Sequence, residues 1–437
     1  MLTYNLRLAL RSLRRNPVLS VLLVGAIGLG IAVSTTFVTA HYILAKNPIP
    51  HKSDVLHYVE MDNWDPNRPW DDQDPKAVPN QVTYRDMVEA MKSDIPTYRG
   101  GSFRASVFIH PDPKVGRPFK AVARMCFADF FRMFEPPFDH GSGWDRNVDN
   151  GPEPVIVLSQ KTNQKLFGGE NSVGRTVRVE DREFKVVGIL QEWRPIPKYY
   201  DPHNGAFEDP EELYMPFGLF RPLKLRSNGN TSNWKSVRFD DPEAFLASEA
   251  IWIQLWVQLD TPAQKEAYLS YLNSYVEGQK KSGRMLRPTN NKLLPVMEWL
   301  EQAKVVPSEA TNLLVISLLF LAVCALNLIG ILMGKFLARA PEVSVRRALG
   351  ASRRSIFLQH VIECETVGVL GGITGVFLAM AGLEGINRMF DNMVQFRLDL
   401  NMLLVSVGLS LVAGLIAGLY PAWRICAIPP AAYLREQ

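Results

Sequence analysis

Cysteine is scarce in this 437-residue sequence, which contains four. Cys324, Cys364 and Cys426 fall in or beside long apolar runs, so Cys126 stands alone in a long hydrophilic stretch. One cysteine cannot form an intramolecular bridge. We therefore expect the hydrophilic stretch to fold around an ordinary apolar core, without a disulfide framework.

Sequence motifs that carry catalysis are also missing. No G-x-x-x-x-G-K-[ST] phosphate loop, G-x-S-x-G turn or H-E-x-x-H helix occurs in the sequence. The seven histidines are scattered, and His51 and His57 have no companion at metal-ligand spacing. We expect no catalytic residue, cofactor or metal in this chain, and a membrane-bound enzyme is disfavoured. The net charge of +4 is too small to indicate a nucleic-acid partner.

Charged residues are absent from four long apolar runs, which are Val18 to Ala40, Thr311 to Gly334, Thr366 to Leu383 and Leu400 to Trp423. A helix needs about 20 residues to cross the hydrocarbon core of a bilayer. The third run is shorter, but an apolar stretch extends it back to Ile356. The first run is longer than the apolar core of about 7–15 residues in a signal peptide, and its cleavage signal is poor. The sequence therefore predicts four transmembrane helices.

The flanking charges predict the orientation of these helices. Basic residues without an acid precede the first run, at Arg7, Arg11, Arg14 and Arg15, and basic residues dominate the segment between the second and third runs. The positive-inside rule places both segments in the cytoplasm. Both termini then lie in the cytoplasm. We expect the chain to be located in the inner membrane. We expect the following parts: a cytoplasmic amphipathic helix over residues 1–17, spans over 18–43, 311–335, 361–383 and 400–423, a periplasmic domain over 44–310, a cytoplasmic coupling segment over 336–360, a short periplasmic loop over 384–399 and a cytoplasmic tail over 424–437.

The N-terminal segment has an amphipathic pattern. Leucines at 2, 6, 10 and 13 share one helical face, whereas the arginines favour the other. This pattern is typical of a helix that lies on the inner leaflet in contact with membrane lipid. A simple stop-transfer cluster of charges is the alternative interpretation.

The long hydrophilic segment predicts an α+β domain that could divide into two subdomains. Strands are expected over 155–158, 176–179, 184–190 and 251–259, and helices over 160–167 and 262–279, the latter capped by Thr261. Residues 293–304 look helical. Residues 193–234 show little periodicity and predict a long loop or insertion. Eight of the nine tryptophans lie in the hydrophilic segment, and we expect most of them to pack loops onto the core.

Residues 339–365 carry local signals for two helices joined by a tight turn. Pro341 suits the first turn of a helix, and Glu342 precedes Arg346 by four residues, the favourable order for an ion pair. Gly350 can end that helix in a left-handed conformation, and Ser352 can cap the next one. The pattern predicts a compact basic projection with a shape that suits docking into another protein. A solvated positive-inside loop is the alternative.

The same residues resemble a known family. The run 342–351 (EVSVRRALGA), followed by Gln359 and Glu363, resembles the signature of FtsX-like permeases, which include MacB-type exporters and lipoprotein-release permeases. A second match, to the MacB-type periplasmic core domain, covers 155–159, 166–169, 173–174, Arg178 and 186–188. The C-terminal residues 420–424, Ile428, Pro429 and Ala432 resemble the closing motif of the family's last span. Ser344 replaces a glycine that is usual in the family, and residues 193–245 align with nothing.

The resemblance implies the permease of an ABC transporter. It implies a cytoplasmic ATPase subunit that binds the ATP, a second permease that is identical or paralogous, and a periplasmic adaptor with an outer-membrane duct. Motion of the ATPases would be transmitted to the periplasmic domain and drive efflux of drugs, peptides or similar substrates. The implied ATPase contact is Glu342, Val345, Arg346, Arg347, Ala348, Leu349, Gly350 and Ala351, with Gln359 and Glu363 as support for coupling. A lipoprotein-release permease and a signalling subunit that regulates a cell-wall hydrolase are the alternatives.

Polar groups are few in the predicted spans. No charged residue lies in the four runs, which argues against a polar conduit for substrate or ions. Asn327 predicts an interhelical hydrogen bond. Glycine pairs at G-x-x-x-G spacing, at 330/334, 368/372, 371/375 and 414/418, indicate close helix packing or a dimer interface. We assign helix packing to Gly371, Gly375, Gly414 and Gly418.

Overall fold

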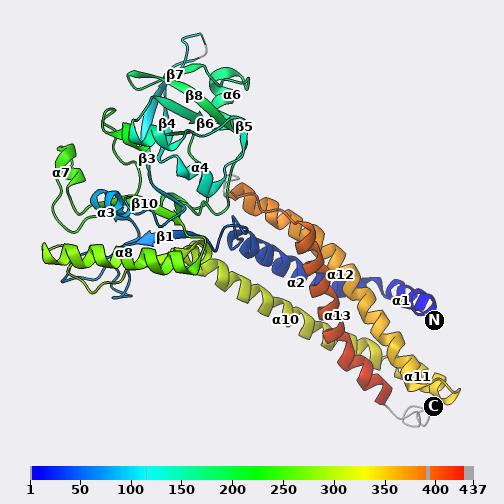
Figure 1. The fold of residues 1–437 in the computed structure, drawn as a ribbon. Coiled ribbons are helices and arrows are strands. Elements are labelled where there is room, and N and C mark those ends of the chain that lie inside the picture. Colours follow the sequence, from blue (N-terminus) through cyan, green and yellow to red (C-terminus); the bar gives the residue numbers. More distant parts are fainter. Residues whose placement is uncertain (1, 115, 390–393, 428–437) are drawn as a thin grey trace. The chain divides into compact units, whose positions relative to one another are not determined.

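The computed structural model describes residues 2–114, 116–389 and 394–427, and these residues form two compact units. The membrane unit comprises the chain up to Ala45 and from Val306 onward, and the inserted domain comprises Lys46–Val305. Figure 1 shows the chain passing from α2 of the membrane unit through the sheet-rich inserted domain and returning in α10. The family-like residues Ile428, Pro429 and Ala432 lie outside the described residues.

The described part of the membrane unit contains helices and no strands. Its elements are α1 (Leu2–Arg15), α2 (Pro17–Leu44), α10 (Ser308–Leu337), α11 (Ala340–Ala348), α12 (Arg353–Met389) and α13 (Leu400–Ala427). Among the described residues, α2, α10, α12 and α13 are long and apolar enough to cross a membrane. The predicted four-span architecture is therefore confirmed. Because α12 has 37 residues, it starts well before its apolar part and continues without a break through residues expected to belong to the coupling segment.

Glycines bring the long helices into close contact. A Cβ atom at Gly371 would lie 2.2 Å from Cγ2 of Ile27, and one at Gly375 would lie 2.8 Å from Ile31, so α12 approaches α2 at glycine distance. On the other side of α12, a Cβ at Gly418 of α13 would lie 2.4 Å from Cβ of Cys364. These glycines serve packing within one chain. Hydroxyls add bonds between helices: Ser34 donates to the carbonyl of Ser317 at 2.8 Å.

Three of the residues expected at helix contacts lie elsewhere. Asn327 is exposed on α10, so the predicted interhelical hydrogen bond within the chain is wrong. A Cβ atom at Gly330 or Gly334 would meet nothing within 4 Å. Both glycines are exposed on α10, where they line a cavity.

The inserted domain is built on one mixed sheet of eleven strands. The strand order is β11-β1-β10-β3-β4-β9-β6-β8-β5, with β2 paired to β10 and β7 paired to β3 and β8. The strands are β1 (Leu56–Glu60), β2 (Val82–Thr83), β3 (Tyr98–His110), β4 (Phe119–Cys126), β5 (Phe138–Gly141), β6 (Val155–Leu158), β7 (Thr176–Val179), β8 (Arg182–Leu190), β9 (Leu213–Pro216), β10 (Ile251–Gln258) and β11 (Lys292–Pro295). The helices are α3 (Tyr84–Ala90), α4 (Asp129–Phe134), α5 (Arg146–Asn150), α6 (Gln160–Phe167), η1 (Pro202–Asn204), η2 (Phe217–Phe220), α7 (Pro242–Leu246), α8 (Pro262–Lys281) and α9 (Val296–Gln302).

Local sequence signals place several of these elements. The side chain of Ser159 accepts a hydrogen bond from the backbone N–H of Thr162 at the start of α6, and Gly168 ends that helix with a positive φ. Thr261 and Gln264 form a capping box at the start of α8. The strands expected near β6, β7, β8 and β10, and the helices α6 and α8, are confirmed as elements.

Two expectations about the inserted domain are wrong. Residues 293–304 are not one helix, because Lys292–Pro295 form strand β11 beside β1 and the helix α9 starts at Val296. The weakly periodic region 193–234 is not only a loop, because β9 lies within it and pairs with both β4 and β6. Most of the tryptophans pack the domain as expected: Trp252, Trp256 and Trp299 are each at most 2 % exposed.

Candidate functional site: a basic helix–turn–helix on the membrane unit

The segment from α10 to α12 forms a short helix followed by a tight turn. Helix α11 starts with Pro341 in its first turn and ends at Ala348. The N–H of Gly350 donates to the carbonyl of Arg347 at 3.1 Å, and the N–H of Ala351 donates to the carbonyl of Arg346 at 3.0 Å. This pair of bonds is the Schellman arrangement, which needs a left-handed residue at the position of Gly350. The φ of Gly350 is indeed +100°. The turn expected from this glycine is confirmed.

Helix α12 starts directly after the turn. The hydroxyl of Ser352 accepts a hydrogen bond from the backbone N–H of Ser355 at 3.2 Å, as expected for an N-cap. Four basic residues lie within nine positions, at Arg346, Arg347, Arg353 and Arg354. Three of these side chains are exposed, whereas Arg347 is half-buried and donates to the carbonyl of Cys426 of α13 at 3.3 Å. The turn is therefore a basic surface that is tied to the end of α13.

The two faces of α11 differ. Ala340, Val343 and Ser344 are buried and face a cluster that includes Phe336, Ile356 and Ile425. On the opposite face Leu349 is 83 % exposed and Val345 is 47 % exposed. Exposed apolar side chains next to basic ones are typical of a surface that another protein covers. A serine at position 344 fits because the position is buried and tolerates a small side chain within a helix.

Most residues of the implied ATPase contact share the exposed surface. Glu342, Val345, Arg346, Ala348, Leu349, Gly350 and Ala351 are exposed, and Arg347 is half-buried. Nη2 of Arg346 lies 2.6 Å from Oε1 of Glu342, and its Nη1 lies 3.4 Å from Oε1 of Gln359 on α12. Gln359 on α12 therefore restrains the guanidinium of Arg346. The structure brings Gln359, but not Glu363, into this group.

Glu363 belongs to a separate buried cluster that joins three helices. Its carboxylate pairs with Nζ of Lys335, near the end of α10, at 2.6 Å and with Nη1 of Arg339, just before α11, at 3.5 Å. It also accepts a hydrogen bond from the hydroxyl of Ser12 on α1, and Nδ1 of His360 lies 3.7 Å away. Glu363 is 2 % exposed and Lys335 is 7 % exposed. Because a buried charge is stable only with its partners, this cluster fixes α1, α10 and α12 relative to one another.

Sequence reasoning did not find the partners of Glu363. Ser12 and Glu363 lie 351 positions apart, and no local spacing rule connects them. A signal was nevertheless present, because Glu363 and Lys335 are charged residues next to apolar runs without a local partner of opposite charge. Such residues usually face the interior of a helix bundle and pair with one another.

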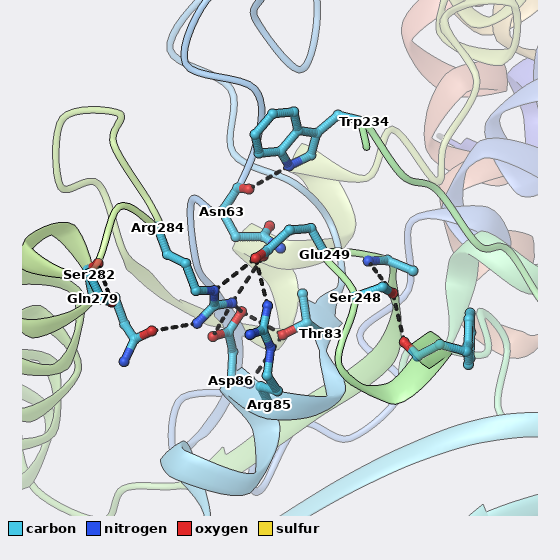
Figure 2. Close-up of polar contacts among 12 residues, drawn as sticks. Asn63, Thr83, Arg85, Asp86, Trp234, Ser248, Glu249, Gln279, Ser282 and Arg284 are labelled. Atoms are coloured by element: carbon cyan, nitrogen blue, oxygen red, sulfur yellow. Dashed lines mark hydrogen bonds and ion pairs between the residues drawn. The ribbon is translucent and has the colours of Figure 1, made fainter. Parts of the chain in front are cut away.

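The inserted domain has its own buried ionic clusters. Figure 2 shows Arg284 between Asp86 and Glu249, with Arg85 reaching the same glutamate. Arg284 lies 2.8 Å from Glu249 through Nε and 3.1 Å from Asp86 through Nη2, and Arg85 lies 2.6 Å from Glu249. Trp234 donates its indole N–H to the carbonyl of Asn63 at 2.9 Å. These contacts hold loops together at the ends of α3 and α8.

A second buried ionic cluster surrounds Arg124, which is fully buried on β4. Nη2 of Arg124 lies 2.5 Å from Asp201 and also contacts Glu211. Burial raises the pKa of Glu211, but the charges of Arg124 and Lys198 more than offset burial and bring this pKa to about 2. Burial lowers the pKa of Lys198. Each charged group of the cluster has a partner of opposite charge, which indicates a structural role for residues 198–211 rather than a catalytic one. Within the described ranges, no three His, Cys, Asp or Glu side chains come together as a metal site.

Comparison with known proteins identifies both units. A family model for the MacB-like periplasmic core domain matches residues 20–275, more than half of the chain, and a model for the FtsX-like permease C-terminal region matches residues 314–430. The basic helix–turn–helix and Glu363 lie within the second match.

The individual relatives share low sequence identity with this chain. The macrolide export ATP-binding/permease protein MacB of Syntrophobacter fumaroxidans is 25 % identical over 345 residues, which cover 70 % of this chain and 46 % of that protein. The pyoverdine export ATP-binding/permease protein PvdT of Pseudomonas aeruginosa is 24 % identical, over 71 % of this chain and 41 % of that protein. The periplasmic region of MacB from Actinobacillus actinomycetemcomitans superimposes with a TM-score of 0.37 at 12 % identity, over 58 % of this chain and 94 % of that one.

The chain thus spans less than half the length of these two curated relatives. Its own two matches nevertheless lie side by side in the sequence, and the described residues contain four helices long and apolar enough to cross a membrane. The chain belongs to the multi-pass membrane permeases that combine a MacB-like periplasmic core domain with an FtsX-like C-terminal region.

Proposed function

We propose that this chain is the permease subunit of an ATP-driven exporter, which receives the motion of a cytoplasmic ABC ATPase through α11 and the following turn. The observation that carries this proposal is the difference between the two faces of α11. One face exposes Leu349, Val345 and Arg346, and the other is packed against the helices of the membrane unit. The positive-inside rule favours a cytoplasmic position for α11.

Three connections would transmit a displacement of α11. Arg347 bonds to the end of α13, and Arg346 contacts Gln359 on α12. Just before α11, Arg339 and Lys335 pair with Glu363, which also binds Ser12. A push on α11 would therefore act on α1, α10, α12 and α13 together. The inserted domain is continuous in sequence with α2 and α10, so rigid movement of these helices would reach it without a polar conduit.

The proposed partners follow from the family and from the names of the relatives. We propose a second permease, identical or paralogous, and an ATPase that binds the nucleotide. The named relatives export a macrolide or pyoverdine, which favours efflux of a small molecule over lipoprotein release. An adaptor and an outer-membrane duct are proposed on family grounds alone.

Co-purification with an ABC ATPase tests the docking surface. The double variant Arg346→Glu with Leu349→Asp changes two exposed side chains and leaves the buried face of α11 intact. We expect it to insert normally but to retain less than a tenth of the ATPase that co-purifies with the wild type. The control is Arg388→Glu, an equal charge reversal at the opposite end of α12, where the side chain is 77 % exposed. Wild-type recovery of the ATPase by the double variant would contradict the proposal.

A further inference from the structure

A cavity of about 710 Å³ lies next to the end of α10, where it opens beside the start of α2 and the start of α11. Its lining combines Arg15 and Leu19 with Gly330 and Gly334, and with Lys335 and Arg339. The docking surface proposed above uses a different part of α11, since only Glu342 belongs to both. The inference that follows therefore does not depend on the proposed function.

Positive charge dominates the lining. Arg15, Lys335 and Arg339 contribute three cations. The carboxylate of Glu342 also lines the cavity, but it pairs with Arg346 at 2.6 Å. Glu363, which lies behind the lining, compensates one of the charges through its pairs with Lys335 and Arg339. Arg15 is exposed and makes no hydrogen bond or ion pair with the described residues. The cavity therefore retains an excess of about two positive charges toward an anion.

Bare helix surface on α10 adjoins the charged end of the cavity. Gly330 and Gly334 are exposed, and among the described residues nothing beyond their own turn of helix lies within 4 Å of a Cβ built on either of them. The flank is thus bare helix surface within the membrane-length helix α10. A flexible hydrocarbon chain fits such a surface, whereas a free inorganic anion would gain nothing from it.

We propose that this cavity binds an anionic phospholipid, with the phosphate at Arg15 and Arg339 and one acyl chain along Gly330 and Gly334. Basic pockets between membrane helices are suited to acidic headgroups, because the cations lie at headgroup depth and the helices offer apolar surface below them. A second copy of the chain is a poorer occupant. A symmetric contact across this surface would bring its cations against the same cations of the partner.

Lipid binding to the purified full-length chain tests this proposal. Native mass spectrometry in detergent measures the affinities for dioleoyl-phosphatidylglycerol and dioleoyl-phosphatidylcholine, which differ in headgroup charge but not in acyl chains. We expect tighter binding of phosphatidylglycerol. Arg15→Gln should weaken it about five-fold, as the loss of one basic residue near an anionic lipid predicts. Arg14→Gln, which removes an exposed arginine outside the cavity lining, should change the affinity less than two-fold.

Gly334→Leu examines the apolar part of the site. The new side chain would fill space that is empty in the chain, so the thermal midpoint should remain unchanged while phosphatidylglycerol binding weakens. Inorganic phosphate at an equal concentration should not displace the lipid. The proposal falls if the two arginine variants bind alike, if phosphatidylcholine binds as well as phosphatidylglycerol, or if phosphate displaces the lipid. It also falls if Gly334→Leu changes the oligomeric state and leaves lipid binding intact, because the face would then be a contact between permeases.

Discussion

Lys335 and Glu363 form an ion pair of 2.6 Å between α10 and α12, and both side chains are at least 97 % buried. The pair lies where α10 passes into the short helix α11, which is the segment that the family resemblance assigns to ATPase contact. Arg339 and Ser12 complete the coordination of the carboxylate. Removing one member of such a pair is costly, because the charge of the other member then stays buried without compensation.

Glu363→Gln should therefore destabilise the membrane unit strongly. The variant leaves the ammonium of Lys335 buried without its counter-ion, at a cost of about 3–5 kcal/mol. The thermal midpoint of the purified full-length chain in detergent measures the effect. Glu365→Gln is the matched control, since Glu365 lies two positions along α12 and its Oε1 is buried without a hydrogen-bond partner among the described residues, so the same substitution breaks no pair. Equal midpoints for the two variants would show that the cluster does not stabilise the unit.

Gly350→Ala should loosen the turn after α11. The φ of +100° is unfavourable for a residue with a Cβ atom and costs about 1 kcal/mol or more, although no atom obstructs the new methyl group. Hydrogen–deuterium exchange of 340–352 in the full-length chain should accelerate. Gly278→Ala on α8 separates conformation from packing, because its Cβ also meets nothing but its φ is not positive. That variant should be neutral or slightly stabilising. Unchanged exchange in Gly350→Ala would argue against the strained turn.

Signals that act over short distances in the sequence were sufficient for part of this structure. Uncharged apolar runs identify the four long helices, because a bilayer imposes their length and composition. Pro341, Gly350 and Ser352 predict the helix–turn–helix, because caps and left-handed turns depend on residues a few positions apart. The hairpin of β7 and β8 was accessible for the same reason. None of these features requires knowledge of distant contacts.

Features that depend on distant partners were not predictable. Strand β9 is four residues long in a region without periodicity, and it forms because β4 and β6 offer free edges on either side. The residues 293–295 were expected to be helical but pair with β1, more than 230 positions earlier. Asn327 was assigned an interhelical bond from its type alone, and its exposure depends on which face of α10 the other helices cover. The partners of Glu363 were missed for the same reason.

Gly371→Ala should weaken the contact between α2 and α12. The added methyl group would lie 2.2 Å from Cγ2 of Ile27, so the β-branched side chain or the helix must shift, at about 1–3 kcal/mol. Gly330→Ala on α10 makes the same chemical change in empty space and should be neutral or stabilising. Thermal midpoints of the two variants in the same detergent compare them directly. A midpoint for Gly371→Ala at or above that of Gly330→Ala would contradict the close packing of α12 on α2.

Glu60 should make the stability of the inserted domain depend on pH. Burial raises the pKa of this carboxyl group from 4.5 to about 7, against the opposing effects of the hydrogen bond from Gln302 and the charge of Lys292. Below about pH 4.5 both the folded and the unfolded state bind the proton. Between pH 4.5 and 7 only the folded state retains it, so the free energy of unfolding falls as the pH rises through this window. The full shift corresponds to about 3 kcal/mol.

Glu60→Gln should remove this dependence, because the amide can still accept the hydrogen bond from Gln302 and carries no charge at any pH. Hydrogen–deuterium exchange of β1 and α9 in the full-length chain, corrected for intrinsic rates, measures the opening free energy at pH 5 and pH 8. Wild-type protection should decrease between these values, and the variant should hold its protection and exceed the wild type at pH 8. Glu301→Gln on α9 serves as control, since Glu301 is exposed, does not contribute to the raised pKa of Glu60 and should retain the wild-type slope. If Glu60→Gln kept the wild-type slope, burial of Glu60 could not account for the loss of protection at high pH. Another group would then be the one that titrates.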